Sequence, residues 1–135
     1  MPELKTRRLF ISHAWTYDSH YWKLIEWFNE EPNFNWTNYS VPSHNGCSEK
    51  TKKGLKECLT NQMSPAQGII ILAGMYAAHS DWIDYEIDEA IRMEKTIIGV
   101  RPWGQERTPV KIQDASDTIV NWNSASIISA IRVWI

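Results

Sequence analysis

The stretch Gly68-Ile69-Ile70-Ile71-Leu72-Ala73 is the clearest strand in the sequence. All of its residues are apolar or small, so we expect both faces of this strand to be buried, as in a central parallel strand covered by helices. Four shorter runs with strand character lie on either side of it along the chain. They predict strands at residues 9–12, 34–41, 96–100 and 118–122.

Amphipathic segments separate these runs. Asp18 is a predicted N-cap, and the helix behind it ends before Pro32. Ser48 is predicted to cap a second helix, residues 81–94 form a third, and a last helix begins near Ser124. Their expected buried positions are Tyr21, Leu24, Ile25, Phe28, Leu55, Cys58, Leu59, Met63, Ile83, Ile87, Ala90, Ile91, Ile127, Ile128, Ile131 and Trp134.

This alternation predicts an α/β protein with a flavodoxin-like, three-layer fold, in which a parallel sheet of about five strands carries helices on both faces. A chain of 135 residues has room for one core, so we expect a single domain spanning residues 1–135.

The composition of the chain excludes several classes of function. With 14 basic and 16 acidic residues, the chain lacks the positive charge of a protein that grips nucleic acid. No apolar run approaches the roughly 18 residues of a membrane span, and no signal peptide is evident, so we expect a cytoplasmic protein away from membranes. Cys47 and Cys58 are expected to be free thiols, and no cluster predicts a metal site.

Ligands of such sheets bind beyond the carboxyl ends of the strands. The residues to consider therefore lie in 12–16, 40–46, 74–82 and 101–104. No G-x-x-x-x-G-K-[ST], G-x-G-x-x-G or G-x-S-x-G sequence occurs, which excludes the usual P-loop, dinucleotide-binding and nucleophile-elbow interpretations.

The sharpest feature is Ser80-Asp81-Trp82-Ile83-Asp84-Tyr85-Glu86. Trp82 and Glu86 are four residues apart and share one helix face. We expect the pair at the rim of the crevice, where desolvation raises the pKa of Glu86 and a nearby helix N-terminus lowers it. Such a carboxylate suits a sugar hydroxyl or an oxocarbenium-like centre, although in isolation the same pattern also fits a solvated acid beside a packing tryptophan.

Other strand-end residues have two interpretations. Trp15, Trp36 and Trp103 fall at or near predicted loops, where a ring can stack on a base or simply pack. Arg101 and Arg107 can meet phosphates, or they can pair with Glu106 or with solvent.

Taken together, these segments resemble a known family. Phe10-Ile11-Ser12-His13-Ala14 resembles the first box of TIR domains, and 80–86 resembles their S-x-W-x-x-x-E box. With Asn38-Tyr39-Ser40-Val41-Pro42 and residues 98–107, the chain is similar over nearly its whole length to the bacterial ThsB-like TIR proteins of the Thoeris anti-phage system.

The resemblance implies an NAD+-consuming enzyme, an NAD+ glycohydrolase or ADP-ribosyl cyclase, with Glu86 as the catalytic residue. It also implies NAD+ as substrate rather than a permanently bound cofactor, self-association through TIR–TIR contacts, and a nucleotide product that activates a separate effector. His13 and Ala14 depart from the commoner residues of the family, and no Cys follows Trp82. The residues expected to contact NAD+ are Ser12, His13, Ala14, Trp15, Trp36, Tyr39, Ser43, Gly74 and Trp82.

Two other functions remain open at this point. Many TIR domains only assemble with other TIR domains, so the chain can be a non-catalytic interaction module. A flavodoxin-like deoxyribosyltransferase would instead use a glutamate as a covalent nucleophile.

Overall fold

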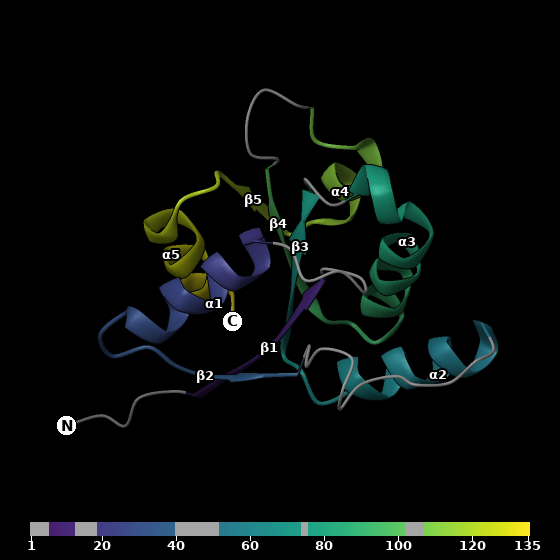
Figure 1. Ribbon diagram of the computed structural model, residues 1–135, viewed down its shortest axis with the longest axis horizontal. Coiled ribbons are helices and arrows are strands. Elements are labelled where there is room, and N and C mark those ends of the chain that lie inside the picture. Colours follow the sequence, from purple (N-terminus) through teal and green to yellow (C-terminus); the bar gives the residue numbers. More distant parts are fainter. Residues whose placement is uncertain (1–5, 13–18, 40–51, 74–75, 102–106) are drawn as a thin grey trace.

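The structure is a computed structural model that describes residues 6–12, 19–39, 52–73, 76–101 and 107–135 (Figure 1). Along the chain its elements are β1 (Thr6–Ser12), α1 (Ser19–Glu30), β2 (Asn35–Asn38), α2 (Lys52–Met63), β3 (Gly68–Leu72), α3 (Tyr76–Arg92), β4 (Thr96–Val100), α4 (Val110–Ala115), β5 (Thr118–Val120) and α5 (Ser124–Trp134). Within those ranges, none of the helices combines the length and the apolar character that a bilayer crossing needs.

The described strands form one parallel sheet in the order β2-β1-β3-β4-β5. Parallel neighbours need crossover connections, and the helices supply them. As Figure 1 shows, α1 and α5 cover one face of the sheet, and α2, α3 and α4 lie on the other. The predicted α/β fold with helices on both faces is confirmed, and the strand order is that of a flavodoxin-like protein.

The core lies on both faces of β3. Ile69, Ile70, Ile71 and Leu72 are all 0% exposed, which is why this strand reads as an uninterrupted apolar run. Two predicted core positions are wrong, because Ile91 is 54% exposed and Trp134 is 47% exposed, each in the last turn of its helix.

Two helices differ from the sequence prediction. α3 begins at Tyr76 instead of residue 81, because Ala77 and Ala78, the strongest helix formers, extend it toward its N-terminus. The sequence also missed α4, whose six residues bury one side chain, Ile112, and so display no periodicity. Pro109 immediately before it was the available signal, since proline is common at helix starts.

One cysteine also differs from expectation. Cys58, in α2, is disulfide-bonded, so the prediction of a free thiol there is wrong. Cys47 lies outside the described residues.

Gly99 in β4 permits α4 to approach the sheet. A Cβ at this position would lie 2.6 Å from Ser116 Oγ and 3.2 Å from Ile112 Cγ2. We therefore expect Gly99→Ala to lower the free energy of unfolding by about 1–3 kcal/mol through overpacking. Urea unfolding measures the loss, and adding Ser116→Ala should recover part of it. A double variant no more stable than Gly99→Ala would contradict this explanation.

Candidate functional site

Ser12 and Glu86 meet between β1 and α3. Ser12 is the last residue of β1 and is 0% exposed, and Glu86 on α3 is 1% exposed. They are the buried polar side chains of the described residues, in a core that is otherwise apolar. The topology thus brings the carboxyl end of one strand and the Trp-x-x-x-Glu helix to the same place.

Burial dominates the electrostatics of this pair. It raises the pKa of Glu86 from 4.5 to about 8, and the hydroxyl of Ser12 opposes the shift only weakly. Although the two side chains approach each other, Ser12 Oγ and Glu86 Oε2 complete no hydrogen bond with a described residue. Buried polar atoms are rarely left in this state, and a strongly perturbed carboxyl with unused hydrogen-bonding capacity is typical of a functional site.

Glu86 does not lie at the rim of the crevice beyond the strand ends, where the sequence predicted it. Because α3 begins at Tyr76, Glu86 lies ten residues beyond its first residue, far from the helix N-terminus. The favourable helix-dipole effect is confined to the first turn, so it does not offset desolvation here. Glu86 is therefore a core carboxyl, neutral at pH 7 in this structure.

Trp82 lies one turn before Glu86 on the same helix. It is half-buried and packs against the hydrophobic core. Residues four apart on a helix are neighbours on one face, so the indole lies one turn from Glu86 on that face. This is a position from which a ring can form a wall for a flat ligand.

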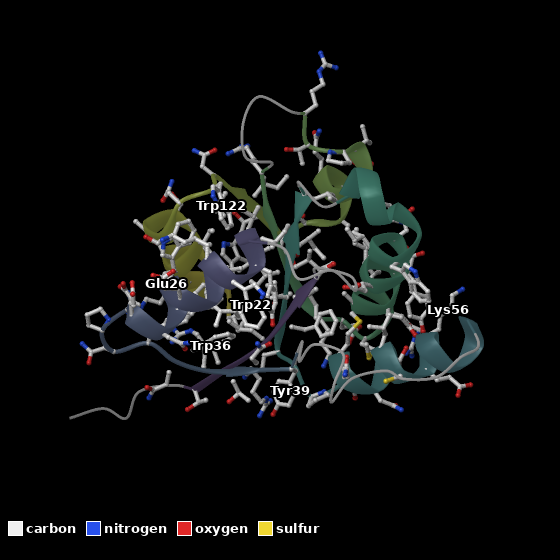
Figure 2. The ribbon with its side chains drawn as sticks, in the orientation of Figure 1. Trp22, Glu26, Trp36, Tyr39, Lys56 and Trp122 are labelled. Carbon is white, nitrogen blue, oxygen red and sulfur yellow. The ribbon has the colours of Figure 1, made fainter. Side chains whose placement is uncertain are left out.

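Trp36 lies elsewhere. Its Nε1 donates a hydrogen bond to Asn29 Oδ1 at 3.0 Å, and its ring meets that of Phe28 edge-on at 5.0 Å. Both partners belong to α1, so Trp36 packs on the α1 face of the sheet (Figure 2). Glu86 belongs to α3, on the opposite face. Trp36 also pairs in register with Arg7, five residues or about 16 Å before Ser12 along the strand.

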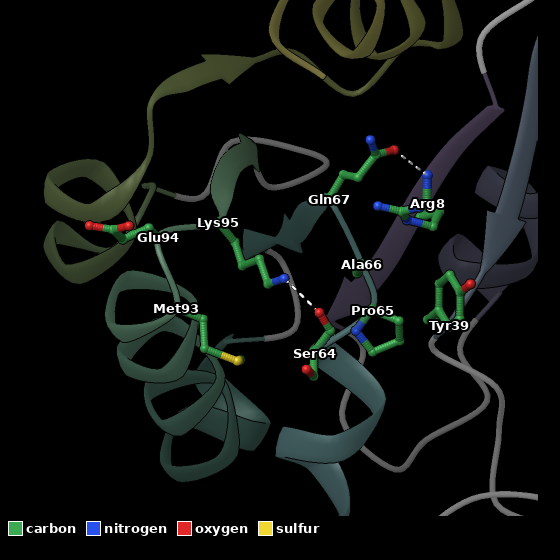
Figure 3. Close-up of a pocket in the computed structure, with 9 residues that line it drawn as sticks. All are labelled: Arg8, Tyr39, Ser64, Pro65, Ala66, Gln67, Met93, Glu94 and Lys95. Carbon is green, nitrogen blue, oxygen red and sulfur yellow. Dashed lines mark hydrogen bonds between the residues drawn. The ribbon is translucent and has the colours of Figure 1, made fainter.

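Tyr39 is also separate from the Ser12–Glu86 pair. With Arg8 and Lys95 it lines a hollow of about 550 Å³ where β1, β3 and β4 begin, at the opposite end of the sheet from Ser12 (Figure 3). Lys95 Nζ already donates to the carbonyl of Ser64 at 2.6 Å. The helix C-termini at this end disfavour anions, so the hollow is a poor site for a nucleotide.

The remaining predicted contacts lie outside the described residues. They are His13, Ala14, Trp15, Ser43 and Gly74. No group of three potential metal ligands occurs among the residues that the structure describes.

A polar network that sequence reasoning missed joins α2 to α3. Thr60 Oγ1 lies 2.6 Å from the Tyr85 hydroxyl and donates to Glu89 Oε1 at 2.7 Å. The Tyr85 hydroxyl also reaches the carbonyl of Lys56 at 3.0 Å, and Arg92 pairs with Glu89. This network holds α3, and with it Glu86, in a fixed position against α2. The four-residue spacing of Tyr85 and Glu89 was its only signal in the sequence.

Comparison with known proteins identifies the family of this chain. No curated protein matches the chain. The family model described as "Thoeris protein ThsB, TIR-like domain" matches residues 10–107, a span that includes both Ser12 and Glu86. Because that match covers well over half of the sequence, the chain belongs to the family of the Thoeris ThsB TIR-like domains.

Proposed function

We propose that this protein is an NAD+-consuming enzyme of anti-phage defence that cleaves the nicotinamide N-glycosidic bond. The observation that carries the proposal is the buried Ser12–Glu86 pair, in which Ser12 Oγ and Glu86 Oε2 have no hydrogen-bond partner among the described residues, in a domain of this family. The product is a cyclic ADP-ribose-type molecule or an ADP-ribose conjugate, and it activates a separate effector in the cytoplasm.

Glu86 acts as a carboxylate on the nicotinamide ribose. Its oxygen atoms accept hydrogen bonds from ribose hydroxyls and stabilise the positive charge that develops at the anomeric carbon. The carbon–nitrogen bond breaks, its electron pair neutralises the cationic nicotinamide ring, and nicotinamide leaves. Water, a ribose oxygen or adenine nitrogen of the same molecule, or a second small molecule then attacks the anomeric carbon. An attacking O–H or N–H group releases its proton to solvent, whereas an adenine ring nitrogen has no proton to lose and takes up the positive charge. Exclusion of water favours the intramolecular attack and so a cyclic product.

Two changes must precede this chemistry. Glu86 is 1% exposed, so the side chains around it must move before a ribose can reach it. Its proton must also leave, and the positively charged nicotinamide ring of a bound NAD+ favours the ionised form. Self-association is the proposed trigger for the movement, because a second copy can rearrange the elements that cover the carboxyl.

The proposal predicts that Glu86→Gln abolishes NAD+ consumption. Glutamine keeps the size and most hydrogen bonding but removes the charge, so we expect the rate of nicotinamide release to fall by about 10³-fold or more. The measurement is mass spectrometry of the nucleotides after incubation of NAD+ with the protein, alone and in lysate from phage-infected cells. Glu30→Gln, the same change at an exposed position of α1, should retain full activity.

The product mass identifies the reaction. ADP-ribose indicates hydrolysis, the mass of ADP-ribose less water indicates cyclisation, and a heavier adduct indicates conjugation. If NAD+ survives under every condition, or if Glu86→Gln consumes it as fast as the wild type, the enzyme is excluded and a non-catalytic TIR interaction module becomes the better explanation.

A further inference from the structure

Two arginines that are separated along the sequence line the same hollow at the carboxyl end of the sheet. Arg101 directly follows β4, and Arg107 precedes α4. The hollow has a volume of about 360 Å³, and its other described lining residues are Thr108, Gln113 and Ile119. None of these five carries negative charge, so within the described part of the chain the hollow is lined by two positive groups and neutral side chains.

The Arg101 guanidinium is held in place. The backbone N–H of Arg101 donates to the carbonyl of Val120 at 2.8 Å, and its Nη1 donates to Asn121 Oδ1 at 2.7 Å. The bond to Asn121 orients one edge of the planar guanidinium, and its other donors form no hydrogen bond with a described residue, so they can meet an anion. Arg107 is exposed and forms no ion pair with a described residue.

The hollow shares a face and an end of the sheet with the Ser12–Glu86 pair. Ser12 is aligned with Ile71, and Ile71 with Gly99, so these three residues form one row across the sheet. Gly99 faces α4, and Arg101 follows two residues later on the same side of the strand. β1 and β4 are separated by β3 alone, which places their axes about 10 Å apart.

An ion pair ties the wall of the hollow to the helix of Glu86. Lys111 Nζ on α4 lies 2.7 Å from Asp88 Oδ1 on α3, and Asp88 is two residues after Glu86. This ion pair thus links α4, which contributes Gln113 to the hollow, to the helix that carries Glu86. The axes of β1 and β4, about two strand spacings apart, are separated by a distance on the scale of a dinucleotide rather than of a single sugar.

We propose that Arg101 and Arg107 form a phosphate-binding subsite, which takes the pyrophosphate of a dinucleotide whose ribose lies at Glu86. Identification of that dinucleotide as NAD+ rests on the proposed function. Guanidinium groups bind phosphate oxygens through paired, charge-assisted hydrogen bonds, and two guanidiniums match two adjacent phosphates. Of the alternatives that the sequence left open for the two arginines, this proposal takes phosphate.

The test compares Arg101→Gln/Arg107→Gln with Lys23→Gln, which removes an exposed charge from α1 on the opposite face. Inorganic pyrophosphate and ADP-ribose are titrated into each protein by calorimetry, also in the Glu86→Gln background. We expect the double variant to bind both probes at least about tenfold more weakly, and Lys23→Gln to bind like the wild type. The KM for NAD+ should rise about tenfold or more, with kcat changed by less than about threefold.

The outcomes separate the two proposals. Arginine-dependent binding of pyrophosphate without NAD+ cleavage supports the subsite and overturns the proposed reaction. NAD+ cleavage with an unchanged KM and unchanged probe affinities in the double variant overturns the subsite and leaves the reaction in place. If pyrophosphate and ADP-ribose fail to bind the wild type, the subsite is also overturned. Both arginines are exposed, so equal thermal unfolding of the variants shows that none of these results reflects misfolding.

Discussion

Between about pH 5 and pH 8 the wild-type protein is expected to lose stability that Glu86→Gln retains. Burial raises the pKa of Glu86 from 4.5 to about 8, so in this interval the folded chain keeps a proton that the unfolded chain releases. A state that binds more protons becomes less stable as the pH rises, and the loss grows from pH 4.5 until the pH passes 8. The total amounts to at most about 5 kcal/mol, a large part of the stability of a domain.

The measurement is urea unfolding of both proteins at half-unit steps from pH 5 to pH 9. The chain has four histidines, which are common to both proteins, so any contribution from them cancels in the difference. Other shifted carboxyl and hydroxyl groups titrate elsewhere, because the pKa of Glu89 is lowered and that of Tyr85 is raised. Glu30→Gln is the control and should follow the wild type. Parallel curves for wild type and Glu86→Gln would show that the carboxyl is not buried in the folded protein.

This pH dependence bears directly on the proposed chemistry. In the proposed reaction a neutral Glu86 could not stabilise a developing cation, so its carboxyl would have to lose the proton before the bond breaks. Ionisation of Glu86 is least unfavourable when a cationic ligand lies beside it, so loss of the proton is linked to binding of the substrate. A site of this kind keeps a reactive carboxylate away from water until the substrate arrives.

The fold could be predicted from the sequence, because the residue patterns that indicate its strands and helices are local and strong. The run from Gly68 to Ala73 identifies a doubly covered strand, and the alternating helices then require parallel pairing. Glu86 was readable as a candidate because Trp82 and the surrounding box identify it. The burial of Glu86 could not be predicted, because it depends on where α3 begins. Helix starts are set by a few weak residue preferences.

Other parts of the site depend on tertiary packing that no local pattern reports. The sequence places Trp36 near a strand end, but the contact with Phe28 puts its ring on the α1 face. The shared hollow of Arg101 and Arg107 likewise requires α4, which is too short to show a periodic pattern. For Trp36 and for the two arginines, the sequence does not show on which face of the sheet the side chain lies.

Phe28→Ala is expected to lower the free energy of unfolding by about 3–5 kcal/mol, the usual cost of removing a buried aromatic ring. Phe28 on α1 is 0% exposed, and its ring lies 5.4 Å from that of Phe34 and 5.0 Å from that of Trp36. It therefore joins α1 to the short edge strand β2, which has a neighbour on one side alone. Urea unfolding followed by circular dichroism gives the loss.

The matched control is Trp22→Ala on the same helix, because Trp22 is 46% exposed and its removal creates no comparable cavity. We expect that variant to lose no more than about 1 kcal/mol. If the two variants were equally stable, the aromatic cluster of Phe28, Phe34 and Trp36 would not be what holds α1 on the sheet. In that case the contacts of Trp36 would no longer establish a packing role, and a role for its ring in stacking on the substrate would again require a test. A large difference instead assigns Trp36 to the structural face of the molecule, opposite to the face on which Glu86 and the two arginines lie.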